Sequence, residues 1–170
     1  MALRMRRAIA HALAVVLLIL QTGTAWAVWV GDQPAPFALL DTRGDLVSLE
    51  HLRGKVVYVD FWASWCGPCR RSFPWMNDLQ RRFGSRGFAI VGVNVDKRRA
   101  DADRFLEQVP SSFPIVFDAA GVTPSAWGVR GMPSSYLLDP QGRVVAVETG
   151  FLDERKALVE ARIEKLLDGR

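Results

Sequence analysis

Two patterns of apolar residues alternate along the chain: near-continuous runs, and residues spaced three and four apart. Near-continuous apolar runs at 55–62 and 88–95 have the composition of strands covered on both faces of a sheet. Between these runs, apolar residues recur at spacings of three and four, which predicts an amphipathic helix through Phe73, Met76, Leu79 and Phe83. Pro74 lies inside this helix, where it removes a backbone donor and should kink it.

The rest of the chain continues the alternation. Short apolar groups at 30–52, broken by Gly31, Pro34, Pro36 and Gly44, predict a hairpin or a pair of edge strands. Further on we expect a helix at 100–109, a strand at 115–117, a helical turn at 124–127, paired strands at 134–138 and 144–149, and a closing helix at 154–167 through Leu158, Ile163, Leu166 and Leu167. The sequence therefore predicts one α/β layered domain at 28–170.

The first 27 residues have the pattern of a secretory signal. Three arginines precede an apolar stretch of about 13 residues at 8–20, and Ala25-Trp26-Ala27 places cleavage after Ala27. The stretch is shorter than the roughly 20 residues of a membrane-spanning helix, although an uncleaved leader acting as an anchor is the alternative. We expect a periplasmic or otherwise exported protein, soluble after cleavage or tethered at its start, in an oxidising compartment.

Charge gives no reason to expect a nucleic-acid partner. The formal charge is +4, and subtracting the three leader arginines leaves +1 for the remainder of the chain. A nearly neutral body lacks the clustered basic residues that displace counterions from nucleic acid or anionic lipid. We expect a monomer that binds no nucleic acid.

The chain has two cysteines, Cys66 and Cys69, separated by Gly67 and Pro68. A structural disulfide is a poor explanation, because closing so short a loop removes little entropy from the unfolded chain. Zinc needs about four ligands, yet beyond the leader the chain has a single histidine and no third cysteine. Covalent haem attachment needs a histidine where Arg70 stands. We therefore expect no metal and no cofactor beyond a redox-active disulfide.

The position of the pair predicts which thiol reacts. Only the thiolate attacks a disulfide, and the start of a helix favours the anion through unpaired N–H donors and the helix dipole. Cys66, at the junction of the first apolar strand and the helix, is the expected nucleophile. Cys69, one turn later and less exposed, is the expected resolving thiol.

Asp60 is an acid inside a strand predicted to be buried on both faces. Burial should raise its pKa, and a carboxyl group with a raised pKa is suited to take a proton from Cys69. The alternative is that Asp60 faces solvent at a sheet edge. Beside the pair, we expect Trp62 to pack in the core and Trp65 to form an exposed apolar rim against a substrate backbone.

The run at 59–69, Val-Asp-Phe-Trp-Ala-Ser-Trp-Cys-Gly-Pro-Cys, resembles the active-site strand and turn of the thioredoxin superfamily. The chain looks most like its exported TlpA/ResA/CcmG-type members, with which it shares the segment beginning at Gly31 and an extra strand and helix between 96 and 120. The resemblance implies a three-layer sandwich with a central mixed sheet, helices on both faces, an N-terminal hairpin extension and a central βα insert. Asp60 and Ser72 depart from that subgroup, which often has Asn and an acid there, toward thioredoxin itself.

A second match lies at 127–134, where Trp-Gly-Val-Arg-Gly-Met-Pro-Ser resembles the family's cis-proline loop. By this resemblance Pro133 is cis and faces the cysteines. Met132 would offer its backbone to a substrate strand. An ordinary trans-proline turn is the alternative.

The resemblance implies a protein-disulfide reductase. Its electron donor would be a membrane protein of DsbD/CcdA type, and its substrate a protein disulfide, of which apocytochrome c in cytochrome c biogenesis is one candidate. An oxidant that forms disulfides is the main alternative. A redoxin-type peroxidase is a third hypothesis, weakened because Ala63 stands where such enzymes place Thr or Ser. A copper chaperone is the fourth.

Overall fold

The structure is a computed structural model that describes residues 27–169. The predicted signal segment, apart from Ala27, lies outside the described residues. Within the described part of the chain, no helix has the length and apolar character needed to cross a membrane.

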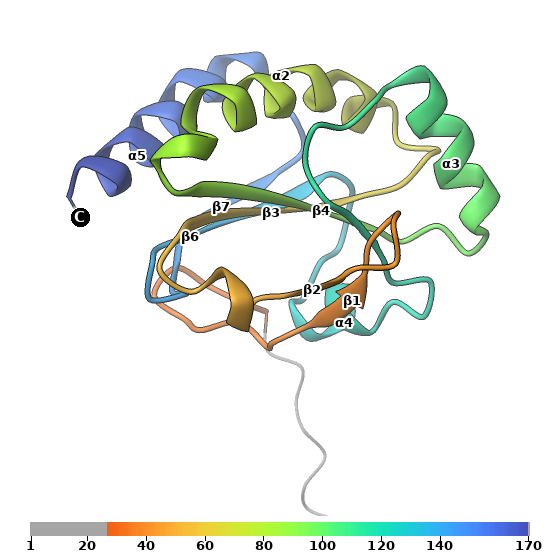
Figure 1. Cartoon of the computed structure of the whole chain (residues 1–170), viewed down its shortest axis with the longest axis horizontal. Helices are drawn as coiled ribbons and strands as arrows, with labels where there is room; N and C mark the ends of the chain where they lie inside the picture. The colour runs from red at the N-terminus through yellow and green to blue at the C-terminus, as the bar shows by residue number, and fades with distance from the viewer. Residues whose placement is uncertain (1–26, 170) are drawn as a thin grey trace, which may run out of the picture.

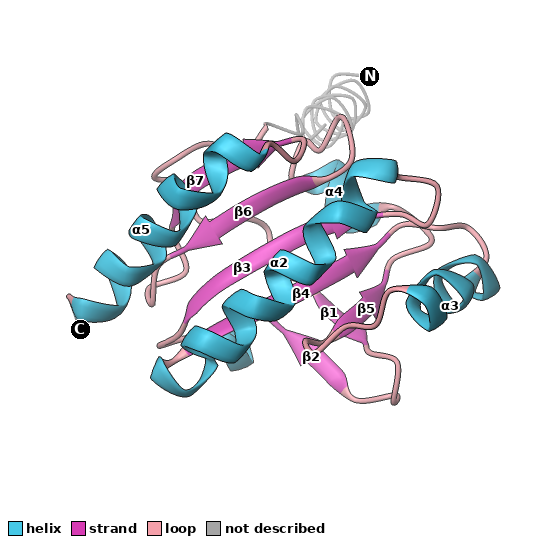
Figure 2. Cartoon of the chain, turned by 90° about the horizontal axis from the view of Figure 1, so that it is seen from above, coloured by secondary structure: helices cyan, strands magenta, loops and turns pink. Residues whose placement is uncertain are grey.

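A five-stranded mixed sheet forms the centre of the molecule, in the order β5-β4-β3-β6-β7 (Figure 2). β3 pairs in parallel with β4, and β4 with β5, whereas β6 runs antiparallel to both β3 and β7. The strands are β3 (Val56–Trp62), β4 (Phe88–Asn94), β5 (Ile115–Phe117), β6 (Ser134–Leu138) and β7 (Val144–Thr149). The central mixed sheet that the resemblance implies is confirmed, and β3 lies at its centre.

Helices cover one face of the sheet more fully than the other. α2 (Gly67–Phe83) lies over β3 and β4, α5 (Lys156–Asp168) lies toward β6 and β7, and α3 (Arg99–Gln108) lies beside the β5 end (Figure 2). On the opposite face are the short α4 (Val122–Ala126) and the hairpin of β1 (Ala38–Leu40) and β2 (Leu46–Ser48) (Figure 1). Three single 3₁₀ turns, at Glu50–Leu52, Gly84–Arg86 and Asp153–Arg155, complete the described elements. The layers, the N-terminal hairpin and the βα insert of α3 and β5 agree with the predicted fold.

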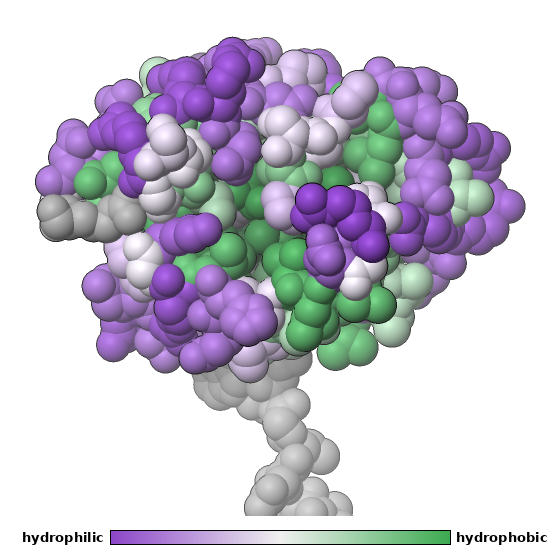
Figure 3. Space-filling model, in the orientation of Figure 1, coloured by the Kyte–Doolittle hydropathy of each residue, from purple (hydrophilic) through white to green (hydrophobic). Residues whose placement is uncertain are grey.

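Two apolar cores lie on the two faces of the sheet, and alternate residues of β3 contribute to each. Val56, Tyr58 and Trp62 belong to the core beneath α2 and α5. Val57, Val59 and Phe61 belong to the core on the opposite face. Successive side chains of a strand point to opposite faces, so Asp60 points toward α2. Outside these cores the outer surfaces of α2, α3 and α5 are mainly polar (Figure 3).

The hairpin contacts residues that lie far from it in the sequence. Asp41 forms an antiparallel bridge to Val116 of β5. Phe37, just before β1, packs against Trp127 with ring centroids 6.3 Å apart. The hairpin therefore covers one sheet edge and part of one face, and it forms its own two-stranded sheet.

The apolar face of the closing helix differs from the prediction. Leu158 is 41% exposed, whereas Val159 is 3% exposed and lines the core with Ile163 and Leu167. A spacing of four residues keeps positions 159, 163 and 167 on one face, while Leu158 lies about 100° away from Val159. The inclusion of Leu158 in the buried stripe was therefore wrong.

Candidate active site

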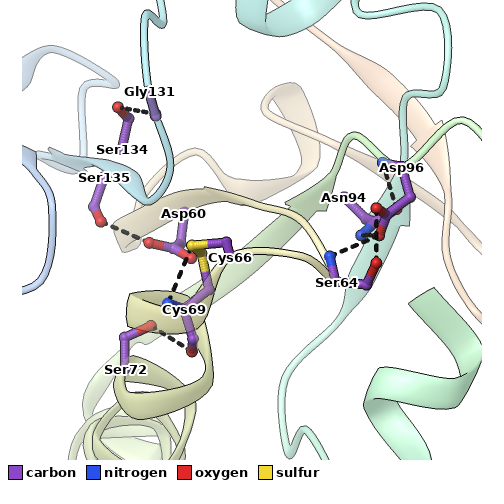
Figure 4. Close-up of a disulfide and its surroundings, with 10 residues drawn as sticks. All are labelled: Asp60, Ser64, Cys66, Cys69, Ser72, Asn94, Asp96, Gly131, Ser134 and Ser135. Carbon is purple, nitrogen blue, oxygen red and sulfur yellow. Dashed lines mark hydrogen bonds between the residues drawn. A yellow bond between two sulfur atoms is a disulfide. The ribbon is translucent and has the colours of Figure 1, made fainter. Parts of the chain in front are cut away.

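Cys66 and Cys69 form a disulfide where β3 passes into α2 (Figure 4). The S–S distance is 2.04 Å. Cys66 is the N-cap of α2, and its Sγ accepts a hydrogen bond from the backbone N–H of Cys69 at 3.2 Å. Pro68 stands in the first turn, where the missing N–H removes no helical hydrogen bond. A Cβ at Gly67 would meet nothing within 4 Å, so the backbone here is open to an approaching chain.

The start of α2 favours negative charge on Cys66 Sγ. The first turn contains no acidic residue, and the N-terminal N–H groups and the helix dipole point toward the sulfur. Cys66 is 4% exposed and Cys69 is fully buried, with its carbonyl accepting a hydrogen bond from Ser72 Oγ at 3.0 Å. The two sulfurs are thus inequivalent in both burial and electrostatic surroundings.

Trp65 and Trp62 lie as the sequence predicted. Trp65, directly before Cys66, is 72% exposed. Trp62 is fully buried and packs against Phe73 and Phe105 with ring centroids 4.9 and 4.8 Å away. The exposed indole therefore lies at the protein surface, next in the chain to Cys66.

Asp60 is buried at 1% exposure on the central strand. Its Oδ1 accepts a hydrogen bond from Ser135 Oγ at 2.6 Å, and its Oδ2 has no partner among the described residues. Burial raises the pKa of Asp60 from 3.8 to about 7, and the Ser135 hydrogen bond offsets part of that rise. In Figure 4 the carboxyl group points toward the disulfide. The alternative of a solvent-facing Asp60 at a sheet edge is therefore wrong.

The Met132–Pro133 peptide bond is cis, as the resemblance implies. In β6, which follows it, Ser134 pairs with Phe61 and Ser135 with Asp60. Pro133 therefore lies beside the end of β3 that leads into the cysteine loop. Met132 is partly buried and packs against both apolar cores.

A carboxylate that the sequence analysis did not single out holds the cysteine loop. Asp96 accepts hydrogen bonds from the backbone N–H and the Oγ of Ser64, each at 2.9 Å (Figure 4). Asn94 Nδ2 donates to the same carboxylate at 2.8 Å. The available signal was Asn94 and Asp96 at the end of a buried strand, because the carboxyl ends of adjacent parallel strands lie together.

Residues 30–167 match the family described as redoxin. The chain belongs to the redoxin family. This redoxin is 36% identical over 124 residues to the thiol-disulfide oxidoreductase ResA of Bacillus subtilis (strain 168), covering 73% of this chain and 69% of ResA. It superimposes with a TM-score of 0.80 on a protein assigned as thiol:disulfide interchange protein DsbE from Chlorobium tepidum, at 46% identity over 83% of this chain and 99% of the other.

A further relative of this redoxin is the pneumococcal exposed lipoprotein thioredoxin Etrx1 of Streptococcus pneumoniae. Its TM-score is 0.68 at 26% identity, over 78% of this chain and 100% of that chain. These relatives confirm the resemblance to ResA and CcmG-like members of the thioredoxin superfamily. With the Cys66–Cys69 disulfide, they identify the redoxin as a thiol-disulfide oxidoreductase.

Proposed function

We propose that this redoxin reduces protein disulfides in an exported compartment, with Cys66 as the nucleophile and Cys69 as the resolving thiol. The observation that carries the proposal is the position of Cys66 Sγ at the N-cap of α2, where it accepts the Cys69 N–H. That arrangement stabilises a thiolate on Cys66 and leaves the more buried Cys69 as a thiol until it reacts.

The reaction proceeds in two exchanges. The Cys66 thiolate attacks one sulfur of the substrate disulfide, and the other substrate sulfur leaves as a thiolate. Cys69 then gives its proton to the Asp60 carboxylate and attacks Cys66 Sγ. The second substrate thiolate is released, the Cys66–Cys69 disulfide forms, and two electrons have passed to the substrate.

Substrate recognition uses the surface around the disulfide. The exposed indole of Trp65 supplies apolar contact area, and Gly67 and Pro68 present a backbone with few side-chain obstacles. The backbone of Met132, before the cis-proline, pairs with an extended substrate segment. Such a segment comes from the substrate protein that carries the disulfide, and an apocytochrome c is one candidate for that protein.

Reduction is the direction supported by the acid beside the cysteines. The Asp60 carboxyl points toward the disulfide in Figure 4. A carboxylate there disfavours a thiolate on Cys69 by like-charge repulsion, which makes the reduced form of the pair less stable. Strong oxidants such as DsbA gain their potential from a stabilised reduced form. A dithiol donor must regenerate the reduced redoxin, and we assign this role to a membrane protein of DsbD/CcdA type. The protein acts in an exported compartment, and its residues 28–170 form a single thioredoxin-like domain that follows the signal segment.

The reduction potential tests the direction. Equilibration with a glutathione buffer, followed by separation of the oxidised and reduced forms, should give a reduction potential of about −270 mV. A value nearer about −120 mV would establish the oxidant alternative instead.

Trapping tests the roles of the two cysteines. A Cys69→Ser variant expressed in its native compartment should accumulate mixed disulfides between Cys66 and its partners, which are released by dithiothreitol and identified by mass spectrometry. The matched control is a variant that also carries Cys66→Ser, in which no such species forms. Absence of any trapped protein in the single variant contradicts the assigned mechanism, and rapid turnover of hydrogen peroxide by the unmodified protein would favour the peroxidase hypothesis.

A further inference from the structure

A four-residue turn connects the end of β3 to the start of α2. The Cys66 backbone N–H donates to the Ala63 carbonyl at 3.1 Å, so Ser64 and Trp65 occupy the two central positions of the turn. Cys66, the last residue of the turn, is also the N-cap of α2. The conformation of this turn therefore determines where Cys66 Sγ lies relative to the backbone N–H of Cys69.

The Asp96 carboxylate binds the first central residue of this turn through two hydrogen bonds. Ser64 donates its backbone N–H to Oδ2 and its hydroxyl to Oδ1, each at 2.9 Å. Asn94 Nδ2 donates to Oδ2 at 2.8 Å, and the Asp96 N–H donates back to Asn94 Oδ1 at 3.1 Å. Asp96 is 6% exposed and Asn94 is 1% exposed. Hydrogen bonds to a carboxylate are stronger than neutral ones, so the turn is firmly attached to the end of β4.

This attachment is separate from the bond between the two cysteines. The Val95 N–H donates to the Trp62 carbonyl at 3.1 Å, so the ends of β3 and β4 stay connected up to the turn. Figure 4 shows the Ser64 side chain directed toward Asp96 and away from the disulfide. Because the attachment runs from β4 to the turn, opening the Cys66–Cys69 bond leaves it in place.

We propose that Asp96 is a positioning residue for disulfide exchange, which holds the turn at Ser64 so that Cys66 Sγ stays at the Cys69 N–H when the disulfide is open. The proposal rests on the proposed role of Cys66 as the nucleophile. In the oxidised protein the covalent bond restrains the two cysteines relative to each other. In the reduced protein this restraint is absent, and the position of Cys66 depends on the turn and its attachment. Asp96 therefore stabilises the reduced form more than the oxidised form.

The reduction potential distinguishes this role from a purely structural one. A carboxylate that only stabilises the fold contributes equally to both redox forms, and its loss leaves the potential unchanged. A carboxylate that stabilises mainly the reduced form also sets the equilibrium between the two forms. Its loss makes the protein easier to oxidise, so the potential becomes more negative.

An Asp96→Asn variant tests the proposal, because asparagine has a similar shape but only one acceptor oxygen for three donors. In a glutathione buffer we expect the equilibrium constant for reduction to fall on the order of three- to tenfold, as for the loss of about one hydrogen bond. At about 30 mV for each factor of ten, the potential shifts by about 15–30 mV to more negative values. Alkylation of Cys66 by iodoacetamide at neutral pH should slow by a similar factor, because less thiolate is present.

Two substitutions of Ser64 give an independent test. Ser64→Ala removes the hydroxyl and leaves the backbone N–H on Asp96, so both effects should be smaller and in the same direction. Ser64→Thr keeps the hydroxyl and should restore the potential and the alkylation rate of the unmodified protein. If Asp96→Asn does not fold, these two variants decide the question.

Asp118→Asn is the matched control. Asp118 is 5% exposed and accepts hydrogen bonds from the backbone N–H groups at 121–123, where α4 begins on the opposite face of the sheet from α2. This variant should lose stability equally in the oxidised and reduced forms, as urea unfolding of each form measures. Its reduction potential and its rate of Cys66 alkylation should remain those of the unmodified protein.

The outcomes separate failure of this inference from failure of the proposed function. Equal loss of stability in both redox forms of Asp96→Asn, with an unchanged potential, refutes the positioning role. A less negative potential refutes it as well. If iodoacetamide modifies Cys69 before Cys66 in the unmodified protein, the assignment of the nucleophile is wrong, and the proposal fails with it. If Cys66 reacts first and the variants change neither its rate nor the potential, only the role of Asp96 is refuted.

Discussion

Replacing Asp60 by asparagine should change how the stability of the oxidised protein depends on pH. In the folded protein burial raises the pKa of Asp60 from 3.8 to about 7, whereas in the unfolded chain the carboxyl has its ordinary pKa. Below about pH 4 the group is protonated in both states and costs nothing. As the pH rises toward 7, the unfolded state ionises first and is stabilised relative to the folded state. Above pH 7 both states are ionised and the loss is complete.

The magnitude follows from the difference between the two pKa values. At about 1.4 kcal/mol for each pH unit, a rise from 3.8 to about 7 lowers the free energy of unfolding by on the order of 4 kcal/mol. Asparagine does not ionise, and its Oδ1 still accepts the Ser135 hydrogen bond. The variant should therefore gain stability over the unmodified protein between pH 4.5 and 8, by a few kcal/mol.

Urea unfolding followed by tryptophan fluorescence, on oxidised protein at several pH values, measures the difference. Asp118→Asn is a matched control at another buried aspartate, because hydrogen bonds from the backbone N–H groups at 121–123 lower the pKa of Asp118 against its burial. Its carboxyl is ionised in both states above about pH 4, so its difference from the unmodified protein should stay constant over this range. An Asp60→Asn difference that is equally constant would refute the buried, high-pKa carboxyl on which the proton chemistry depends.

Four further substitutions test the packing and the exposed rim. Trp65→Ala should leave the free energy of unfolding within about 0.5 kcal/mol, but slow the reaction with a folded protein disulfide far more than that with dithiothreitol, as stopped-flow fluorescence would measure. Gly92→Ala should cost about 1–3 kcal/mol in urea unfolding, because its Cβ would lie 2.7 Å from Ile115 Cδ1 in the packed core. Val159→Ala should destabilise the protein by about 1–2 kcal/mol and Leu158→Ala by less than about 0.5 kcal/mol in the same assay, and the reverse order would contradict the register of α5.

Features that depend on neighbouring residues were predictable from the sequence. The apolar run at 55–62 predicted the central strand β3, and the helical spacing after Cys69 predicted α2. The cysteine pair could therefore be placed at their junction. The burial of Asp60 followed from its position in that strand. The cis-proline came from the resemblance, because nothing in the local pattern at Met132–Pro133 distinguishes cis from trans.

Features that depend on strand register or distant contacts were not predictable. Ser64 and Asp96 are 32 residues apart, and only the parallel pairing of β3 with β4 brings them together. The pairing of Ser135 with Asp60 on one side and with Glu148 on the other requires the registers of two strand pairs at once. In the closing helix the error arose because Leu158 and Val159 are adjacent apolar residues, and only packing against the sheet decides which one is buried.

The contacts of the N-terminal hairpin impose an order on folding. Its strands are synthesised first among the described elements, yet its bridge is to Val116 and its aromatic contact is to Trp127. An isolated two-stranded hairpin is marginally stable in water. The segment at 37–48 must therefore wait until some 80 further residues have emerged, with its apolar side chains uncovered meanwhile. A chain that ended before β5 would contain the cysteine pair but lack Val116 and Trp127, the residues that contact the N-terminal hairpin. The redox motif is therefore synthesised well before the fold around it can close.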